Sequence, residues 1–514
     1  MNVNAIQRAR YCLLFALGYC VVSFPYYTNL ATFLQSDDFV IIHFYKYISL
    51  SRFWEFFSPY ALFFYRPFQT IAFQSLYHTF GLVPLPYHIL SFILHTVCVC
   101  LWMSVVYRLF KDVALSVLTG FFFAVSWVYT YTVSWAGNFG TLLSVLFTLV
   151  MLLSFYTFLY TRKRRWRLLS LVSLAAALLS KETAIHGIVL VSLLSVVFCV
   201  VRRKNIPEKS PDTEVPWKRS AIALIPFAIL SLGYVVFHFT CVRDVYTWVK
   251  KYYAFQSLYR TPESALISLN HLFFFFRFDE VFGAASVKPI WDFLIVNVQI
   301  VPLAALIYAI IRRDPVMLFG FGFCLIALYP GLLLEDFHES RHYYLPAMGC
   351  ALVMSALVLQ AIRWLRERKK NYVKPLTILL VAFIGYMFLA SMGYNYTLNV
   401  EMKEQSKRIE RLNTFLQDKK NVIPTQSLLI VRGLNREKDF INGLGLRELV
   451  KLALEDDSIE AILEDQTFSD DILDHLRTTF SPDRHFYITY SNQRYTLERC
   501  APISPQTSSH EGNS

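Results

Sequence analysis

Residues 139–201 read FGTLLSVLFTLVMLLSFYTFLYTRKRRWRLLSLVSLAAALLSKETAIHGIVLVSLLSVVFCVV, and this stretch decides the fold. It holds three apolar runs, separated by the basic segment RKRRWR at 162–167 and by the short charged turn SKET at 180–183. A helix rises 1.5 Å per residue, so about 20 apolar residues cross the ~30 Å hydrocarbon core of a bilayer. The stretch therefore predicts membrane-spanning helices that turn back across a bilayer.

The same pattern extends over the first three quarters of the 514-residue chain, which is 55% hydrophobic and only 17% charged. Ordinary soluble domains contain about 25% charged residues. This composition excludes a secreted globular enzyme, a disordered chain and a coiled coil. We expect eleven spans, near residues 11–33, 87–107, 113–133, 139–160, 167–180, 184–201, 219–240, 291–311, 315–334, 343–362 and 375–394.

Lys and Arg are distributed unevenly over the loops. With a cytoplasmic N-terminus, the cytoplasmic segments hold 23 of the 34 Lys and Arg of residues 1–394, and the opposite segments hold 12 of the 18 Asp and Glu. The positive-inside rule therefore predicts a cytoplasmic N-terminus and an extracytoplasmic C-terminal domain. Membrane topology also accounts for the basic pI of about 9.1, so we expect no nucleic-acid partner.

The predicted architecture is an all-α polytopic membrane domain, residues 1–394, followed by a small extracytoplasmic α/β domain. The membrane domain has a first outer loop at 35–86 and a long outer loop at 241–290. Within the long loop, residues 264–278 are expected to form an interfacial or re-entrant helix, because a further span would place the basic loops after it on the outer side.

The soluble domain is expected at 395–500, and residues 501–514 are expected to be disordered. Its predicted elements are a helix near 399–418, a strand at 427–431, an amphipathic helix at 446–456 and a hairpin of strands at 485–490 and 494–498. Asn395-Tyr-Thr397 also fits a glycosylation sequon, a match that is common by chance.

Charged residues beside apolar spans are costly, so they mark candidate sites. Asp37 and Asp38 follow the first span and are suited to act as a general base and its orienting partner, or as metal ligands. The alternative is a solvated start of the loop. Arg66 lies in Tyr65-Arg66-Pro67, where it is suited either to bind a phosphate or to extend toward the lipid headgroups.

Lys181 and Glu182 join two spans without a polar loop. The span before them has only about 14 apolar residues, roughly 21 Å, so this turn is expected below the outer surface in a polar cavity. The alternative is an ion pair closed between the two neighbours. Residues 335–346, EDFHESRHYYLP, form a further outer loop, in which Arg341 is suited to a phosphate unless the loop is merely solvated.

Four segments, in this order, are similar to a known group of enzymes. SDDF (36–39), YRPFQTIAFQSLYHTFGLVPLPYHILSFILH (65–95), LLSKETA (178–184) and ESRHYYLP (339–346) resemble segments of the GT-C membrane glycosyltransferases, and within them the protein O-mannosyltransferase-like enzymes. Ser91 stands where that group has Asn. The C-terminal domain is neither a tetratricopeptide array nor a β-trefoil, so the acceptor stays open.

The resemblance implies transfer of a mannose-like hexose from a polyprenyl-phosphate donor to an acceptor hydroxyl at the extracytoplasmic face, with inversion. Asp37 would act as the base and Asp38 would orient it. Arg341, Arg66 and Lys181 would bind the donor phosphate. The residues that would orient these groups or the substrate are Glu339, His338, Glu182, Tyr65 and His88.

Several points stay open at this level. Some members of the group use a divalent cation, and the sequence does not decide whether this chain does. The acceptor is a protein, a lipid or a glycan, and the expected location is a bacterial inner membrane. A glycan ligase, a lipid-linked glycan transporter or flippase, and a membrane assembly protein are the alternatives. A transporter fits less well, because no internal repeat is visible and the charges gather at the outer helix ends.

Overall fold

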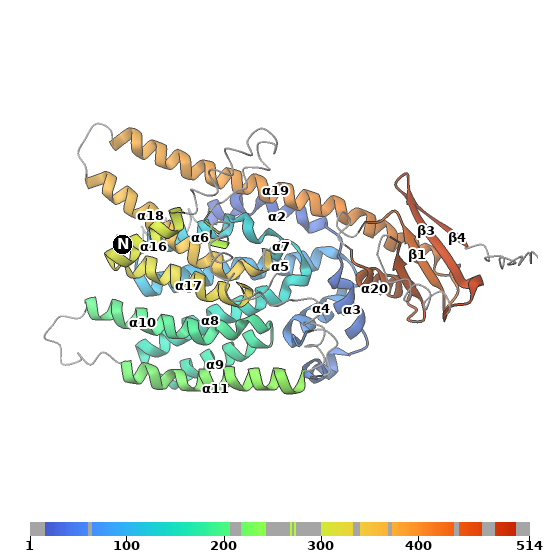
Figure 1. Ribbon diagram of the computed structural model, residues 1–514, viewed down its shortest axis with the longest axis horizontal. Coiled ribbons are helices and arrows are strands. Elements are labelled where there is room, and N and C mark those ends of the chain that lie inside the picture. Colours follow the sequence, from blue (N-terminus) through green and yellow to red (C-terminus); the bar gives the residue numbers. More distant parts are fainter. Residues whose placement is uncertain are drawn as a thin grey trace, which may run out of the picture. The chain divides into compact units, whose positions relative to one another are not determined.

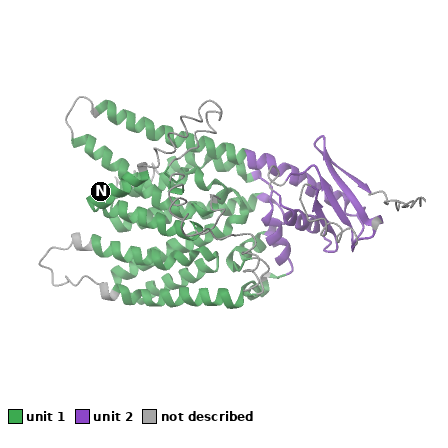
Figure 2. Cartoon of the chain, viewed as in Figure 1, with its two compact units in different colours: residues 1–30, 48–76, 85–400 green, residues 31–47, 77–84, 401–514 purple. Residues whose placement is uncertain are grey.

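In the computed structural model, the described residues are almost entirely helical up to residue 419, and a small sheet follows (Figure 1). The structure describes residues 16–59, 64–205, 217–242, 268–269, 272–273, 300–332, 340–367, 373–435, 441–464 and 479–499. The chain divides into two compact units, shown in green and purple in Figure 2. Each unit is considered by itself.

Unit 1 comprises residues 1–30, 48–76 and 85–400, and its described residues form helices and short connecting turns. The longer elements that lie wholly or mainly in unit 1 are α4 (Pro67–Phe80), α5 (Pro84–Phe110), α6 (Val113–Val125), α8 (Phe139–Thr161), α9 (Arg164–Leu178), α10 (Gly187–Asn205), α11 (Trp217–Cys241), α16 (Ile300–Arg312), α17 (Pro315–Leu332), α18 (Tyr344–Glu367) and α19 (Val373–Lys419). Residues 77–80 of α4 and 401–419 of α19 belong to unit 2. The short elements are α2 (Phe24–Tyr27), η1 (Thr28–Ala31), η2 (Leu50–Phe57), η3 (Trp127–Tyr129), α7 (Thr130–Ser134), η4 (Ala136–Asn138), η5 (Glu182–His186) and η7 (Ser340–His342).

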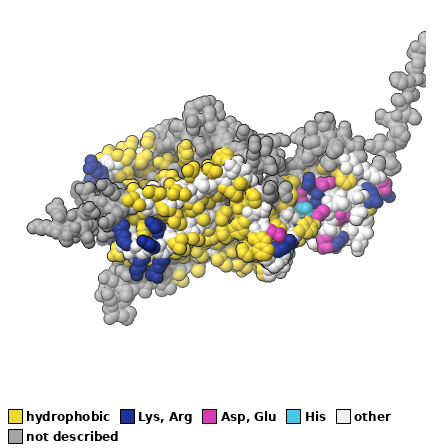
Figure 3. Space-filling view, turned by 90° about the horizontal axis from the view of Figure 1, so that it is seen from below, with side chains coloured by type: hydrophobic (Ala, Val, Ile, Leu, Met, Phe, Trp, Pro, Cys, Tyr) yellow, Lys and Arg dark blue, Asp and Glu magenta, His cyan; other side chains and the backbone are white. Residues whose placement is uncertain are grey.

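Within the described residues, seven helices are long and apolar enough to cross a membrane, or eight if the bent pair of α6 with η3 and α7 is one span. Helix α16 adds a shorter apolar segment, and α9 has 15 residues, fewer than a full span needs. Figure 3 shows that the visible face of the helical unit is hydrophobic and that Lys and Arg gather at one end. A large exposed hydrophobic surface of this kind is typical of a protein that lipid surrounds. The predicted all-α membrane domain with a small α/β domain after it is confirmed.

The expected span at 113–133 is not one straight helix. Helix α6 ends at Val125, and the chain bends by 50° before η3 and α7. The freed carbonyl oxygen of Val125 accepts hydrogen bonds from Ser391 Oγ at 2.6 Å and from Asn395 Nδ2 at 2.9 Å on α19. Inside a membrane such a break is tolerated only when neighbouring groups satisfy the backbone, as these do. Asn395 is fully buried, so the sequon match is a packing residue.

Polar contacts join the loops at the basic end of the bundle. Arg363 on α18 forms an ion pair of 2.9 Å with Asp112, which caps the start of α6. Gln360 on α18 donates to Asp314, which caps the start of α17, at 2.6 Å. These contacts place alternate loops at the same end, which is the alternation that the loop charges predict.

Unit 2 comprises residues 31–47, 77–84 and 401–514. Its sheet has the order β2-β1-β3-β4. β1 is parallel to β2 and β3, and β3 and β4 form an antiparallel hairpin. The elements are α3 (Asp37–Tyr45), β1 (Leu428–Arg432), α20 (Gly443–Leu454), β2 (Glu460–Leu463), η8 (Pro482–Arg484), β3 (His485–Ser491) and β4 (Arg494–Arg499).

The sheet forms because its strands alternate or are wholly apolar. All but the last residue of β1 are buried, as expected for a central parallel strand. Helix α20 then connects β1 to its parallel neighbour β2, the usual crossover for parallel strands. The expected strand at 427–431, the helix at 446–456 and the hairpin are confirmed, whereas β2 is an addition to the prediction.

Three predictions lie wholly or mostly outside the described residues. The long loop at 241–290 and the C-terminal segment at 501–514 are two of them. Of the expected interfacial or re-entrant helix at 264–278, only 268–269 and 272–273 are described, and they are helical. Phe273 is buried and stacks on Phe321 of α17 at 5.7 Å between ring centroids. The interfacial or re-entrant helix at 264–278 stays a prediction.

Candidate active site

The charged turn after α9 lies at the end of the bundle opposite the basic loops, since α9 starts in one of those loops at Arg164. The start of α8 packs directly on this turn: a Cβ on Gly140 would lie only 2.9 Å from the Ser180 carbonyl oxygen. The close approach brings Thr141 to Lys181, whose ammonium donates a hydrogen bond of 2.7 Å to the threonine hydroxyl. Lys181 is 5% exposed, so this is a buried cation, as predicted for the turn.

Glu182 is tied to Arg66, 116 residues earlier in the chain. The guanidinium donates from Nε and Nη2 to the two carboxylate oxygens at 2.9 and 2.6 Å. It also lies over the ring of Phe64 at 4.1 Å from the centroid. A bidentate pair of this kind fixes the orientation of both side chains. The sequence-based alternative, an ion pair closed between Lys181 and Glu182, is replaced by this longer-range pair.

A small, partly open cavity of about 30 Å³ lies among α8, η5, η7 and the ends of α17 and α18. Its volume suffices for a water molecule or two. The cavity brings together two of the three predicted phosphate-binding cations, Lys181 and Arg341. The polar and charged lining residues that matter for chemistry are Thr141, Lys181, Thr183, His186, Arg341 and His342.

Two histidines contribute to this lining, and the sequence analysis singled out neither. His186 is 8% exposed, and within the described residues neither of its ring nitrogens has a hydrogen-bond partner. A buried polar group without a partner is costly, so this side chain is suited to meet a ligand or a water in the cavity. Burial lowers the pKa of His342 well below its usual range, and the nearby charges of Lys181 and Arg341 lower it further.

Two other predicted substrate residues do not line the cavity. Tyr65 is buried and donates to the carbonyl oxygen of Phe57 at 3.1 Å. His88 is buried too, and its Nδ1 lies 3.0 Å from the amide nitrogen of Asn29, which donates to the carbonyl oxygen of Ser134 at 2.6 Å. Both side chains therefore hold short segments of the bundle together. Their contacts give neither one a place in the cavity.

The acidic pair forms the first turn of α3 in unit 2. Before it, Ser36 has φ +40° and ψ −105°, a conformation that costs on the order of 1–3 kcal/mol for a residue with a Cβ. Asp38 is 1% exposed and accepts a hydrogen bond of 2.8 Å from the backbone N–H of Gln35. Asp37 is half-buried. The helix N-terminus favours negative charge on both carboxylates.

The remaining predicted site residues, His338 and Glu339, lie outside the described residues. In the part of the chain that the structure describes, no group of three or more His, Cys, Asp and Glu side chains is arranged to hold a metal ion. The described residues therefore offer no ready site for the divalent cation that the sequence left open.

No family model and no curated protein matches the sequence. Among solved structures, the archaeal oligosaccharyltransferase AglB of Archaeoglobus fulgidus, in complex with an inhibitory peptide and a dolichol-phosphate, matches 94% of this chain and 69% of its own, with 11% identity and a TM-score of 0.46. ArnT of Cupriavidus metallidurans, bound to undecaprenyl phosphate, matches 95% of this chain and 97% of its own, with 15% identity and a TM-score of 0.44.

Proposed function

We propose that the protein is an integral-membrane glycosyltransferase that moves a mannose-like hexose from a polyprenyl-phosphate donor to an acceptor hydroxyl on the extracytoplasmic face of a bacterial inner membrane. The observation that carries the proposal is the cavity at the end of the bundle away from the basic loops, where Lys181 and Arg341 meet. Buried cations are costly unless they serve a purpose, and an anionic headgroup supplies one.

The chemistry of the lining supports placing the donor phosphate at the open side of this cavity, because the present volume holds only a water molecule or two. Arg341 offers planar paired donors and Lys181 a point charge, the two usual ways of binding a phosphate. Thr183 and His186 add hydrogen-bonding groups to the same lining. Arg66 supports the site from beside it, because its guanidinium holds Glu182 at the end of the turn that carries Lys181. The polyprenyl chain would lie on the apolar helix surface.

In the proposed reaction, Asp37 removes the proton from the acceptor hydroxyl. The acceptor oxygen attacks the anomeric carbon and forms the new glycosidic bond. The bond between that carbon and the phosphate oxygen breaks, and its electron pair leaves with the polyprenyl phosphate. The cations stabilise the charge that grows on the departing phosphate. Direct displacement inverts the anomeric centre. Asp38, held by the Gln35 N–H, keeps the turn in place for its neighbour.

The test uses purified protein in liposomes with radiolabelled mannosyl polyprenyl phosphate, and membranes from a strain lacking the gene as the source of acceptor. Asp37→Asn should abolish transfer while expression and thermal unfolding stay unchanged, since the two side chains have the same shape. Glu404→Gln, at an exposed carboxylate of the same unit, serves as the matched control and should transfer normally. Normal transfer by Asp37→Asn would remove the base assignment.

Transfer by the wild-type chain is the broader test. Label that moves into an acceptor supports the proposal. Label that stays on the donor but changes membrane leaflet would instead identify a flippase. Comparing the glycans on envelope proteins and lipids with and without the gene then identifies the sugar and the class of acceptor.

A further inference from the structure

The acidic pair belongs to the same compact unit as the C-terminal domain, although segment 31–47 and residues 401–514 lie far apart in the sequence. The chain that leads into the pair lies along α19: the Phe33 N–H donates to Ser406 Oγ at 3.0 Å, and Gln35 Nε2 donates to the Met402 carbonyl oxygen at 3.3 Å. The segment 31–47 is therefore a structural part of this domain.

The first turn of α3 packs directly on the first turn of α20. A Cβ on Gly445 would lie 2.7 Å from the carbonyl oxygen and 2.8 Å from the Cα of Ser36, so only glycine allows this approach. Ser36 is the residue with the strained positive φ. Strain of this kind persists only where the surroundings impose it, and it gathers at functional sites. Here the packing against Gly445 imposes it, one residue before Asp37.

Asn442 connects the two helix ends through its side chain. Its Oδ1 caps α20 by accepting from the Gly445 N–H at 2.7 Å. Its Nδ2 donates to Asp37 Oδ1 across a long hydrogen bond of 3.4 Å. One amide thus caps the start of α20 and donates to one oxygen of the acidic pair.

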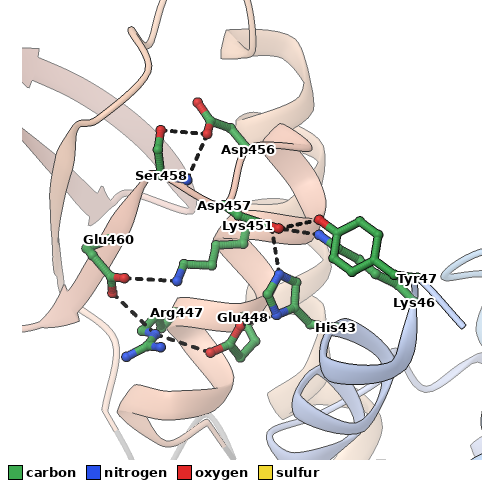
Figure 4. Close-up of polar contacts among 10 residues, drawn as sticks. All are labelled: His43, Lys46, Tyr47, Arg447, Glu448, Lys451, Asp456, Asp457, Ser458 and Glu460. Carbon is green, nitrogen blue, oxygen red and sulfur yellow. Dashed lines mark hydrogen bonds and ion pairs between the residues drawn. The ribbon is translucent and has the colours of Figure 1, made fainter. Parts of the chain in front are cut away.

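Ion pairs and hydrogen bonds hold the other end of α3 (Figure 4). His43 lies between two carboxylates, with Nδ1 at 2.5 Å from Glu448 and Nε2 at 2.8 Å from Asp457. Lys46 binds Asp457 at 2.7 Å, and the Tyr47 hydroxyl donates to it. Burial alone would raise the pKa of Asp457 and of Glu448, but hydrogen bonds from these partners hold both pKa values below their usual range. The helix that carries the acidic pair is fixed at both ends.

We infer that the task of the C-terminal α/β domain is to hold the acidic pair in its working geometry, and that Asn442 is the positioning residue for Asp37. This inference rests on the proposed function. A domain that served only to dock a partner would not need to cap its own helix with the side chain that binds Asp37.

The test separates the two roles of Asn442 in the full-length protein. Ser and Asp both cap helices well. Asn442→Ser therefore keeps the cap and loses the donor to Asp37, and Asn442→Asp keeps the cap and sets a second negative charge beside it. We expect kcat to fall about 3- to 10-fold in the first variant, the value of one hydrogen bond, and about 10-fold or more in the second. The KM for mannosyl polyprenyl phosphate and the resistance of the domain to proteolysis should stay unchanged.

Gln417→Ser removes an exposed amide from α19 in the same unit and should behave as wild type. Normal kcat in both Asn442 variants would overturn the inference, even if Asp37→Asn is inactive. A loss of kcat that only follows a loss of protease resistance would overturn it as well. Asp37→Asn with normal transfer would instead remove the proposed function.

Discussion

Replacing Lys181 with methionine should lower the rate of sugar transfer strongly while changing the free energy of unfolding only slightly. Methionine has a similar length and no charge. Lys181 is 5% exposed, so the folded protein bears a desolvation penalty of several kcal/mol that the substitution removes. The substitution also removes the hydrogen bond to Thr141, and bonds to charged groups contribute about 1.5–3 kcal/mol. These effects oppose each other, so we expect the free energy of unfolding to change by no more than about 1 kcal/mol.

The effect on transfer should be much larger. A preorganised donor that stabilises charge in the transition state contributes about 10²–10³ in kcat, or roughly 2.7–4 kcal/mol. The assay is transfer from mannosyl polyprenyl phosphate, measured beside thermal unfolding of the same detergent-solubilised sample. Arg363→Met, at the exposed ion pair with Asp112 at the other end of the bundle, is the control; it should cost at most about 1 kcal/mol and leave transfer unchanged. Transfer by Lys181→Met at the wild-type rate, or a loss explained by unfolding, would refute the reasoning.

Two further predictions concern topology and pH. Single cysteines at Arg164 and Glu498, both exposed, can be introduced into a protein without native cysteines. A membrane-impermeant thiol reagent should label the first only from the cytoplasmic side and the second only from the outer side. Labelling of both from one side would contradict the predicted topology. The folded-state pKa values of Asp457 and Glu448 are lowered, so their stabilisation is present above the unfolded pKa and is lost as the pH falls through the folded pKa. The C-terminal domain should therefore lose stability below about pH 4, which acid denaturation followed by proteolysis can measure. Asp457→Asn should weaken this pH dependence. An unchanged acid denaturation profile in this variant would contradict the role of Asp457 in holding α3.

The local elements of this fold were predictable from the sequence because each depends on short-range pattern. Apolar runs of span length gave the long helices, and alternation around a short turn gave the hairpin of β3 and β4. The buried position of Lys181 also followed from a local quantity, the short apolar run before it. These features need no knowledge of what the chain meets elsewhere.

The pairings could not be predicted because they join distant parts of the chain. Nothing in the sequence near Glu182 indicates that its ion-pair partner is Arg66. The adjacent Lys181 instead suggests an ion pair between these two neighbours, whereas Glu182 pairs with Arg66 in the structure. No proline near Val125 predicts the bend that follows it. The bend depends on the hydrogen bond from Asn395 to the Val125 carbonyl oxygen, and the sequence around Asn395 resembles a glycosylation site. The second role of Asn442 depends on α3 arriving beside α20, which only the tertiary fold decides.

The central claim is that the cations of the cavity and the acidic pair act on one donor molecule. The most direct measurement is a cryo-EM structure of the full chain in a lipid nanodisc with a non-hydrolysable mannosyl polyprenyl phosphate analogue. The account predicts the phosphate within hydrogen-bonding distance of Lys181 and Arg341, with the Asp37 carboxylate facing the anomeric carbon across a gap that fits an acceptor hydroxyl. A donor phosphate bound elsewhere, or an Asp37 carboxylate that opens away from the bound sugar, would contradict it.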